Sequence, residues 1–326
     1  MDNKNIFIFI LLLIALILFP FMVPNKYYIS VMVVVGFNVL IVIGLGMLMG
    51  YAGQISLGHA AFYGLGAYTS GALCTKFHFN PWLALLCGII LTAGVAYLIG
   101  VPSLKLKGYY LAMATLGFGE IVFIVFNELS VFTGGPSGMT SIPRLSVYGF
   151  TLNTDLRFYC FVWGIVLVSI IISINIVNSR VGRALLAIHG SESAALAVGI
   201  NVASYKVQVF VLSAVFASIA GSLYAHFVTF ISPSSFGFMQ SIMLVTMVVI
   251  GGMSDIWGAC LGALIITILP EYLHVFHDYE ILIFGITLMI IMILMPKGLF
   301  VSFIDGIRWI KTKIFGKSDE SDPVSI

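Results

Sequence analysis

The sequence contains very little charge. Only 9% of its 326 residues are Asp, Glu, Lys or Arg, while 60% are hydrophobic, and soluble domains carry roughly 25% charged residues. No polar block is long enough to form a separate soluble domain. We therefore expect one all-α integral membrane domain over residues 1–303. The remaining tail, residues 304–326, is basic and then acidic, and we expect it to be cytoplasmic and partly disordered.

Cysteine is scarce, and nucleotide-binding motifs are missing. The four cysteines stand singly in apolar segments, and no pair has metal or redox spacing. The phosphate-binding pattern G-x-x-x-x-G-K-[ST] does not occur. The His and acidic residues of 274–280 lie among aromatic side chains of the kind that gather at membrane interfaces. We therefore expect no catalytic residues, cofactor, metal site or nucleic-acid partner.

Apolar runs of about 20 residues, the length that crosses roughly 30 Å of hydrocarbon, are abundant. They predict about ten transmembrane helices, within a range of eight to ten. These spans cover residues 6–23, 28–49, 55–73, 82–102, 108–128, 155–178, 203–228, 239–252, 258–274 and 281–296. The third is glycine-rich and polar, so it is either continuous, broken or re-entrant. The eighth and ninth are short and form either two spans or one broken unit, with Asp255 expected to cap the turn between them.

The distribution of Lys and Arg predicts that both termini are cytoplasmic. With the N-terminus inside, eleven of the fifteen basic residues fall in inner segments: Lys4, Lys105, Lys107, Arg180, Arg183, Lys206, Lys297, Arg308, Lys311, Lys313 and Lys317. The outer segments hold the other four, Lys26, Lys76, Arg144 and Arg157.

The stretch from Gly50 to Tyr68 is unusually polar, with five glycines, a Gln, a Ser and a His. Such a backbone at membrane depth is tolerated only where protein buries it or where it lines a cavity. One interpretation is a wall of a polar path through the membrane; the alternative is close helix packing through small and polar residues. The path candidates here are Gln54, Ser56, Gly58 and His59.

The predicted span 108–128 contains two further path candidates, Thr115 and Glu120. A carboxylate inside a membrane is costly unless it is paired or solvated, and is functional by default. Glu120 is therefore either part of the path or a hydrogen-bonded structural residue.

The longest inner connection, residues 179–202, predicts two short helices. Ser191 is suited to cap the second helix, Glu192 lies in its first turn, and Gly199 is suited to end it. Such a rigid, alanine-lined surface suits docking into a groove on a partner.

Several motifs resemble the LivM-type permease subunits of the high-affinity branched-chain amino acid ABC transporter family. The pattern Glu192-x-Ala194-Ala195-x-x-x-Gly199 resembles the loop that couples ABC importer permeases to their ATPases. The other matching blocks run in family order: residues 50–62, 107–121, 133–138, 179–185, Gly251-Gly252-Met253-x-x-x-Trp257-Gly258 and 295–299. The sequence departs from the family at His189-Gly190, where a basic or acidic residue is more usual, so the detailed contacts of the loop stay open.

The resemblance implies a multi-pass subunit of a transporter in the bacterial cytoplasmic membrane. A LivH-like permease would complete the membrane path, two ATP-binding subunits would bind ATP and Mg, and a periplasmic or lipid-anchored binding protein would deliver substrate. The implied coupling residues are Arg180, Arg183, Glu192, Ala194, Ala195 and Gly199, and the implied binding-protein contacts are Thr133, Gly134 and Gly135.

Three alternatives remain at this stage. The same class of importer could carry urea, amides or other amino acids. An ion-coupled carrier would need coupling residues at the midplane and no structured inner loop. A membrane enzyme would need a nucleophile–base pair or a metal-spaced pair inside the spans, and none is evident.

Overall fold

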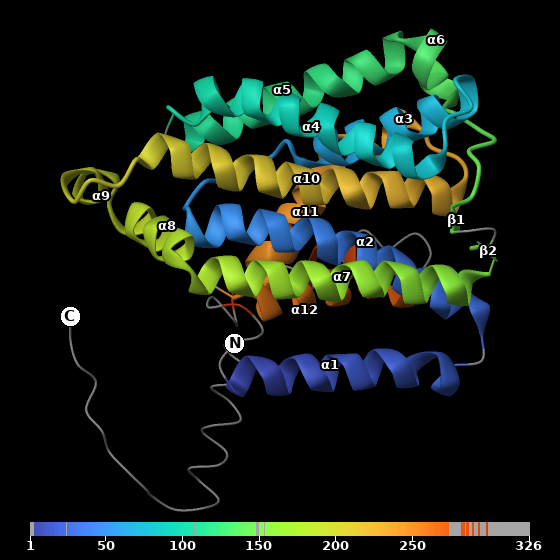
Figure 1. Cartoon of the computed structure of the whole chain (residues 1–326), viewed down its shortest axis with the longest axis horizontal. Coiled ribbons are helices and arrows are strands. Elements are labelled where there is room, and N and C mark those ends of the chain that lie inside the picture. Colours follow the sequence, from blue (N-terminus) through green and yellow to red (C-terminus); the bar gives the residue numbers. More distant parts are fainter. Residues whose placement is uncertain are drawn as a thin grey trace, which may run out of the picture.

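The computed structural model describes residues 3–23, 25–106, 108–147, 150–152, 154–253 and 255–273, with single positions at 282, 283, 285, 286, 289, 293 and 298. Its long helices run side by side along one axis (Figure 1). They are α1 (Asn3–Met22), α2 (Lys26–Gly46), α3 (His59–Lys76), α4 (Pro81–Ser103), α5 (Tyr109–Glu128), α7 (Asp155–Asn178), α10 (Val202–Val228), α11 (Phe238–Gly251) and α12 (Ile256–Leu273).

Short elements lie at the two ends of this bundle (Figure 1). At one end are α8 (Arg180–Gly190) and α9 (Glu192–Ala197). At the other are α6 (Ser130–Thr133) and an antiparallel hairpin of β1 (Ser146–Val147) and β2 (Phe150–Thr151). We call these the α8–α9 end and the hairpin end. Single helical turns of other types occupy Met47–Tyr51 (π), Gly135–Ser137 (3₁₀) and Pro233–Phe236 (3₁₀).

Eight of the described helices are long and apolar enough to cross a membrane. They confirm the prediction of an all-α integral membrane protein. α3 is not one of the eight, although it has 18 residues and lies inside the bundle. The predicted tenth span, residues 281–296, lies mostly outside the described residues, as do the 274–280 cluster and the 304–326 tail.

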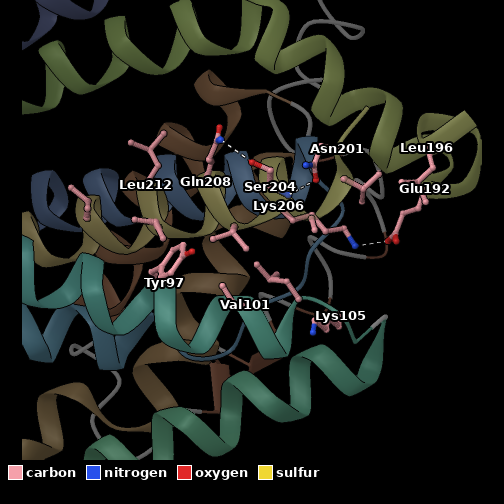
Figure 2. A pocket seen from close by; sticks show the side chains of 16 residues that line it. Tyr97, Val101, Lys105, Glu192, Leu196, Asn201, Ser204, Lys206, Gln208 and Leu212 are labelled. Atoms are coloured by element: carbon pink, nitrogen blue, oxygen red, sulfur yellow. Dashed lines mark hydrogen bonds and ion pairs between the residues drawn. The ribbon is translucent and has the colours of Figure 1, made fainter. Parts of the chain in front are cut away.

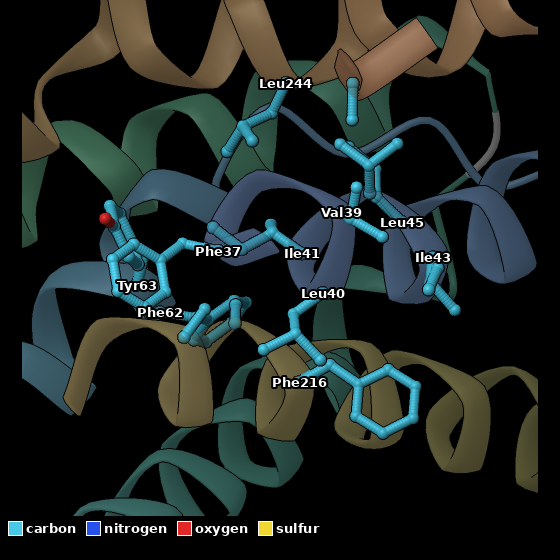
Figure 3. Close-up of a cluster of buried hydrophobic side chains, with 14 of the residues drawn as sticks. Phe37, Val39, Leu40, Ile41, Ile43, Leu45, Phe62, Tyr63, Phe216 and Leu244 are labelled. Carbon is cyan, nitrogen blue, oxygen red and sulfur yellow. The ribbon is translucent and has the colours of Figure 1, made fainter. Parts of the chain in front are cut away.

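α2 forms the core of the bundle. Apart from Val34, every residue from Met32 to Ala52 is buried, and apolar side chains leave this helix in all directions. Figure 3 shows Phe37, Leu40 and Leu45 of α2 among side chains of α3, α10 and α11. The Phe37 ring makes edge contacts with Phe158 of α7 and with Tyr224 of α10. A helix that is apolar on all sides is stable only when it is surrounded, and here the other helices provide that shell.

α3 and α10 pack closely, through small residues. A side chain at Gly66 would overlap the backbone oxygen of Ser218, and one at Gly221 would overlap that of Tyr63. Ser222 Oγ donates to the carbonyl oxygen of Gly66 at 3.0 Å. Small residues with polar bonds across the interface are the usual means by which membrane helices associate.

The third predicted span begins later than expected. We predicted a helix from residue 55, but α2 continues as a π-helical turn to Tyr51, residues 52–58 are not helical, and α3 begins at His59. Gly53 has φ +65°, which a right-handed helix does not contain. α3 itself is one continuous helix, and the non-helical residues 52–58 lie before it, between α2 and α3.

α11 and α12 are two separate helices rather than one broken unit. The Asp255 carboxylate accepts a hydrogen bond from the Trp257 N–H at 3.1 Å, which confirms its predicted turn role.

Candidate functional site

α8 and α9 project from the bundle as a rigid pair of short helices (Figure 1). Ser179 caps α8 by accepting from the Val181 N–H at 3.1 Å, and Ser191 caps α9 by accepting from the Ala194 N–H at 3.3 Å. The second cap and the position of Glu192 in the first turn of α9 confirm the sequence prediction.

α9 ends where the sequence predicts. Gly199 has φ +83°, and its N–H donates to the Leu196 carbonyl at 3.0 Å. The Ile200 N–H donates to the Ala195 carbonyl at 3.0 Å, which completes a glycine-dependent helix stop. The loop is thus held by specific backbone bonds at both of its helices.

An ion pair ties α9 to α10. Lys206 Nζ lies 2.5 Å from Glu192 Oε1, and the Lys206 side chain is only 3% exposed. Figure 2 shows this pair at the α9 end of a largely apolar groove of about 980 Å³ between α4 and α10. Because its charge is so well buried, Lys206 depends on Glu192, so α9 is fixed to the end of a membrane helix.

The free face of α9 differs from the expected alanine surface. Ala195 is buried against Ile188 and Val202, while Ala194 is exposed. The most prominent exposed side chains are Leu196, at 60%, and Val198, at 75%. The sequence motif predicted that the alanines form the docking surface. The burial of Ala195 shows instead which face of α9 is free.

The two basic candidates on α8 lie on its exposed side. Arg180 and Arg183 are exposed, and Arg183 donates to the Asn178 carbonyl at 3.4 Å. The opposite face of α8 is buried through Gly182, Ala184, Leu185 and Ile188. Arg180, Arg183, Ala194 and Gly199 therefore share the exposed surface of the loop, while Glu192 is half-buried and Ala195 is buried.

The end of α2 and the non-helical residues after it lie against this loop. His189 Nδ1 is 2.8 Å from the Gly50 carbonyl oxygen, so the ring N–H donates to the end of α2. A side chain at Gly50 would collide with the Met253 carbonyl in the turn between α11 and α12. Gly50 thus lies in contact with two other segments at once, a relationship that the sequence did not reveal.

The path candidates Ser56 and His59 form a buried hydrogen-bonded chain. Ser56 Oγ lies 3.0 Å from His59 Nδ1, and His59 Nε2 lies 2.6 Å from Ser213 Oγ of α10. Both candidates are 1% exposed. These bonds join the start of α3 to α10, as expected if the polar residues serve close helix packing. That Ser56 and His59 line a path remains a prediction.

The non-helical segment, residues 52–58, is also stabilised by Gln54, Gly58 and Thr115. Gln54 donates to the Ala52 carbonyl at 2.9 Å. Thr115 Oγ1 accepts from the Leu57 N–H at 3.0 Å, and a side chain at Gly58 would lie 2.6 Å from the Thr115 carbonyl oxygen. α5 therefore satisfies a backbone donor that the break in the helix leaves free.

Glu120 is different, because it is exposed on α5. It lines a small cavity with Leu57, Leu116 and Ser241. Within the described part of the chain it has no hydrogen-bond or ion-pair partner. It is therefore available to a partner subunit or to the path.

The outer-loop candidates mainly support one another. Thr133 Oγ1 donates to the Phe126 carbonyl at 2.7 Å and accepts from the Gly135 N–H at 3.1 Å. Thr133 and Gly135 are buried, and Gly134 is exposed. Their proposed contact with a binding protein remains a prediction.

Comparison with known proteins places these features in a family. Residues 27–294 match the model described as "Branched-chain amino acid transport system / permease component". The chain is 31% identical to the high-affinity branched-chain amino acid transport system permease protein LivM of Salmonella typhimurium, over 91% of this chain and 75% of that protein. It is 26% identical to LivH of Escherichia coli, over 78% of this chain and 87% of that protein. It is also 26% identical to the fructose import permease protein FrcC of Rhizobium meliloti, over 65% of this chain and 61% of that protein. No solved structure matches.

Proposed function

Since the chain belongs to the family of branched-chain amino acid transport permease components, we propose that it is one membrane subunit of an ATP-driven importer of these amino acids. The observation that carries this proposal is the α8–α9 loop. It projects from the bundle, both of its helices are capped, and it is anchored to α10 by the ion pair of Glu192 with the buried Lys206. An ion-coupled carrier has no need of such a loop, whereas an ATP-driven importer needs a surface that receives force from outside the chain.

The complete importer would have four kinds of partner. A LivH-like permease forms the other half of the membrane path, and two ATP-binding subunits dock at the α8–α9 end, which is then cytoplasmic. A substrate-binding protein docks at the hairpin end, outside the cell, and the lipid bilayer surrounds the helices. ATP and Mg are bound by the ATPases, and this chain has no catalytic role.

The contacts suggest how ATP would drive alternating access. Docking would use the exposed Ala194, Leu196 and Val198. Movement of the loop would pass through Glu192 and Lys206 into α10, and through His189 into the π-helical end of α2. Both routes meet at the Ser56–His59–Ser213 chain. Such short rigid connections transmit a rigid-body movement rather than absorb it.

Uptake by the reconstituted complex tests this function. Proteoliposomes holding both permeases and both ATPases, with the binding protein outside, should accumulate radiolabelled L-leucine, L-isoleucine and L-valine only with internal ATP. ATP-dependent uptake of urea or acetamide in place of leucine would favour the alternative of an importer for urea or amides. Uptake that follows an ion gradient without ATP would contradict the importer assignment.

A further inference from the structure

A cavity of about 330 Å³ lies between α11 and α12, against α2, α3 and α10. Near the α8–α9 end the two helices touch backbone to backbone, since side chains at Gly251, Gly258 and Gly262 would overlap the opposite chain. Beyond this contact the cavity separates Gln240 and Met243 of α11 from the last turns of α12. The volume is at the lower end of the range for small-molecule sites, about 300–1,000 Å³.

The cavity is lined by three polar side chains that each keep an oxygen without a partner among the described residues. Tyr63 is 5% exposed and lines the cavity together with Tyr224, and the two rings lie 5.5 Å apart. Neither hydroxyl has a hydrogen-bond partner within the described part of the chain. Asn38 donates to Thr267 Oγ1 at 2.8 Å, but its own carbonyl oxygen accepts no bond there. These oxygens are accessible from the cavity rather than sealed in the core, so they can bond to a polar occupant.

The charge of the cavity favours a cation. Its lining contains one charged residue, the Glu271 carboxylate, and no Lys, Arg or His. Glu271 also accepts a hydrogen bond from the Tyr27 hydroxyl. The carboxylate is a suitable acceptor for an ammonium group.

The rest of the lining is aliphatic and includes Val34, Met243, Met247 and Ile266. Methionine adapts to aliphatic groups of different shape. The cavity therefore combines an ammonium acceptor, hydroxyl donors suited to a carboxylate, and an apolar wall.

We propose that this cavity is a transient binding site for L-α-amino acids with aliphatic side chains inside the permease. The ammonium lies toward Glu271, the carboxylate receives the Tyr63 and Tyr224 hydroxyls, and the side chain packs on Val34 and Met243. The proposal rests on the proposed function and adds to it a site within this chain. Urea would leave the apolar wall unused, and an acidic side chain would find no cation.

Protection of an introduced thiol tests the site. Gln240→Cys is made in a complex whose native cysteines are replaced by Ser or Ala, and the complex is purified in nanodiscs without the binding protein. A charged thiol reagent should modify position 240, and millimolar L-leucine should slow the reaction at least fivefold. L-glutamate should not slow it. Met239→Cys is the matched control, because Met239 is adjacent, 68% exposed and outside the cavity; leucine should not change its modification rate.

Two further variants make the result decisive. Glu271→Gln should abolish leucine protection at position 240 while the rate without leucine stays the same. Ser235→Cys, on another wall of the cavity, provides a second reporter if Gln240→Cys fails to fold. Absence of protection at both positions, in a complex that imports leucine in proteoliposomes, would overturn the cavity proposal alone. Absence of leucine import by the wild-type complex would overturn the proposed function as well.

Discussion

The imidazole of His189 in α8 donates a hydrogen bond to the backbone carbonyl of Gly50, with 2.8 Å between Nδ1 and the oxygen. Gly50 lies in the π-helical turn that ends α2, and it also touches the backbone of Met253. One side chain thus connects the projecting loop to the most buried helix of the bundle. His189 is also one of the two residues at which the sequence analysis predicts a departure from the family pattern.

Loss of this bond should weaken coupling without unfolding the protein. His189→Leu removes the donor, and a single hydrogen bond contributes about 0.5–1.5 kcal/mol. We expect leucine uptake per ATP hydrolysed to fall about two- to tenfold, while insertion and complex assembly are normal. His189→Asn is the matched variant, because its amide N–H can take the place of Nδ1–H and should restore most of the coupling. Equal coupling in His189→Leu and wild type would exclude this contact as a route of transmission.

The ion pair between Lys206 and Glu192 should contribute more to stability than a surface pair. Glu192→Gln leaves a nearly buried ammonium without an opposite charge, and hydrogen bonds to charged groups contribute about 1.5–3 kcal/mol. We expect a lower thermal denaturation midpoint for the purified chain and weaker co-purification of the ATPases. Lys105→Met, at an exposed lysine that lines the same groove, should change neither measurement. An unchanged midpoint in Glu192→Gln would show that α9 is held by other contacts.

The glycines at the α3–α10 interface should tolerate no side chain. Gly221→Ala would press a methyl group onto the Tyr63 carbonyl, and overpacking of this kind typically costs about 1–3 kcal/mol. We expect reduced yield of folded protein, measured by size-exclusion chromatography in detergent. Gly94→Ala is the control, since nothing lies within 4 Å of the added methyl group, and alanine favours a helix by about 1 kcal/mol over glycine. Similar yields for the two variants would contradict the close packing of these helices.

Glu120 should matter for transport rather than for folding. It is exposed within the membrane-spanning helix α5 and has no partner in the described residues, so neutralising it breaks no bond within them. A carboxylate that faces lipid is energetically costly. We therefore expect the Glu120 side chain to face a partner subunit or the path. We expect Glu120→Gln to reduce leucine uptake at least tenfold with normal expression. Glu128→Gln, at the exposed end of the same helix, should keep normal uptake. Normal uptake in Glu120→Gln would instead favour a structural role.

The sequence predicts the local features of this fold well. The caps at Ser191 and Asp255, the helix stop at Gly199 and the spans near α4, α5 and α7 depend on residues close to one another in the chain. The polarity and glycine content of residues 50–68 indicated an irregular segment in this region, but α3 begins at His59 rather than at residue 55 and is itself continuous.

Contacts between distant segments could not be predicted in the same way. α1 and α2 are both strongly apolar, so hydrophobicity does not show that α2 is central and α1 peripheral. The bonds from His189 to Gly50 and from His59 to Ser213 join residues 139 and 154 positions apart. The cavity at Tyr63 needs five helices to form, and no local pattern marks it.

Cross-linking from α9 tests most directly whether an ATPase drives this subunit. Leu196→Cys, labelled with a photoactivatable maleimide in the assembled complex, should form an adduct with an ATP-binding subunit, and the yield should change when ATP is added. Phe132→Cys, at the hairpin end and 46% exposed, should form no such adduct. Adducts with the ATPase from Phe132→Cys, or none from Leu196→Cys in a complex that transports leucine, would contradict docking at the α8–α9 end.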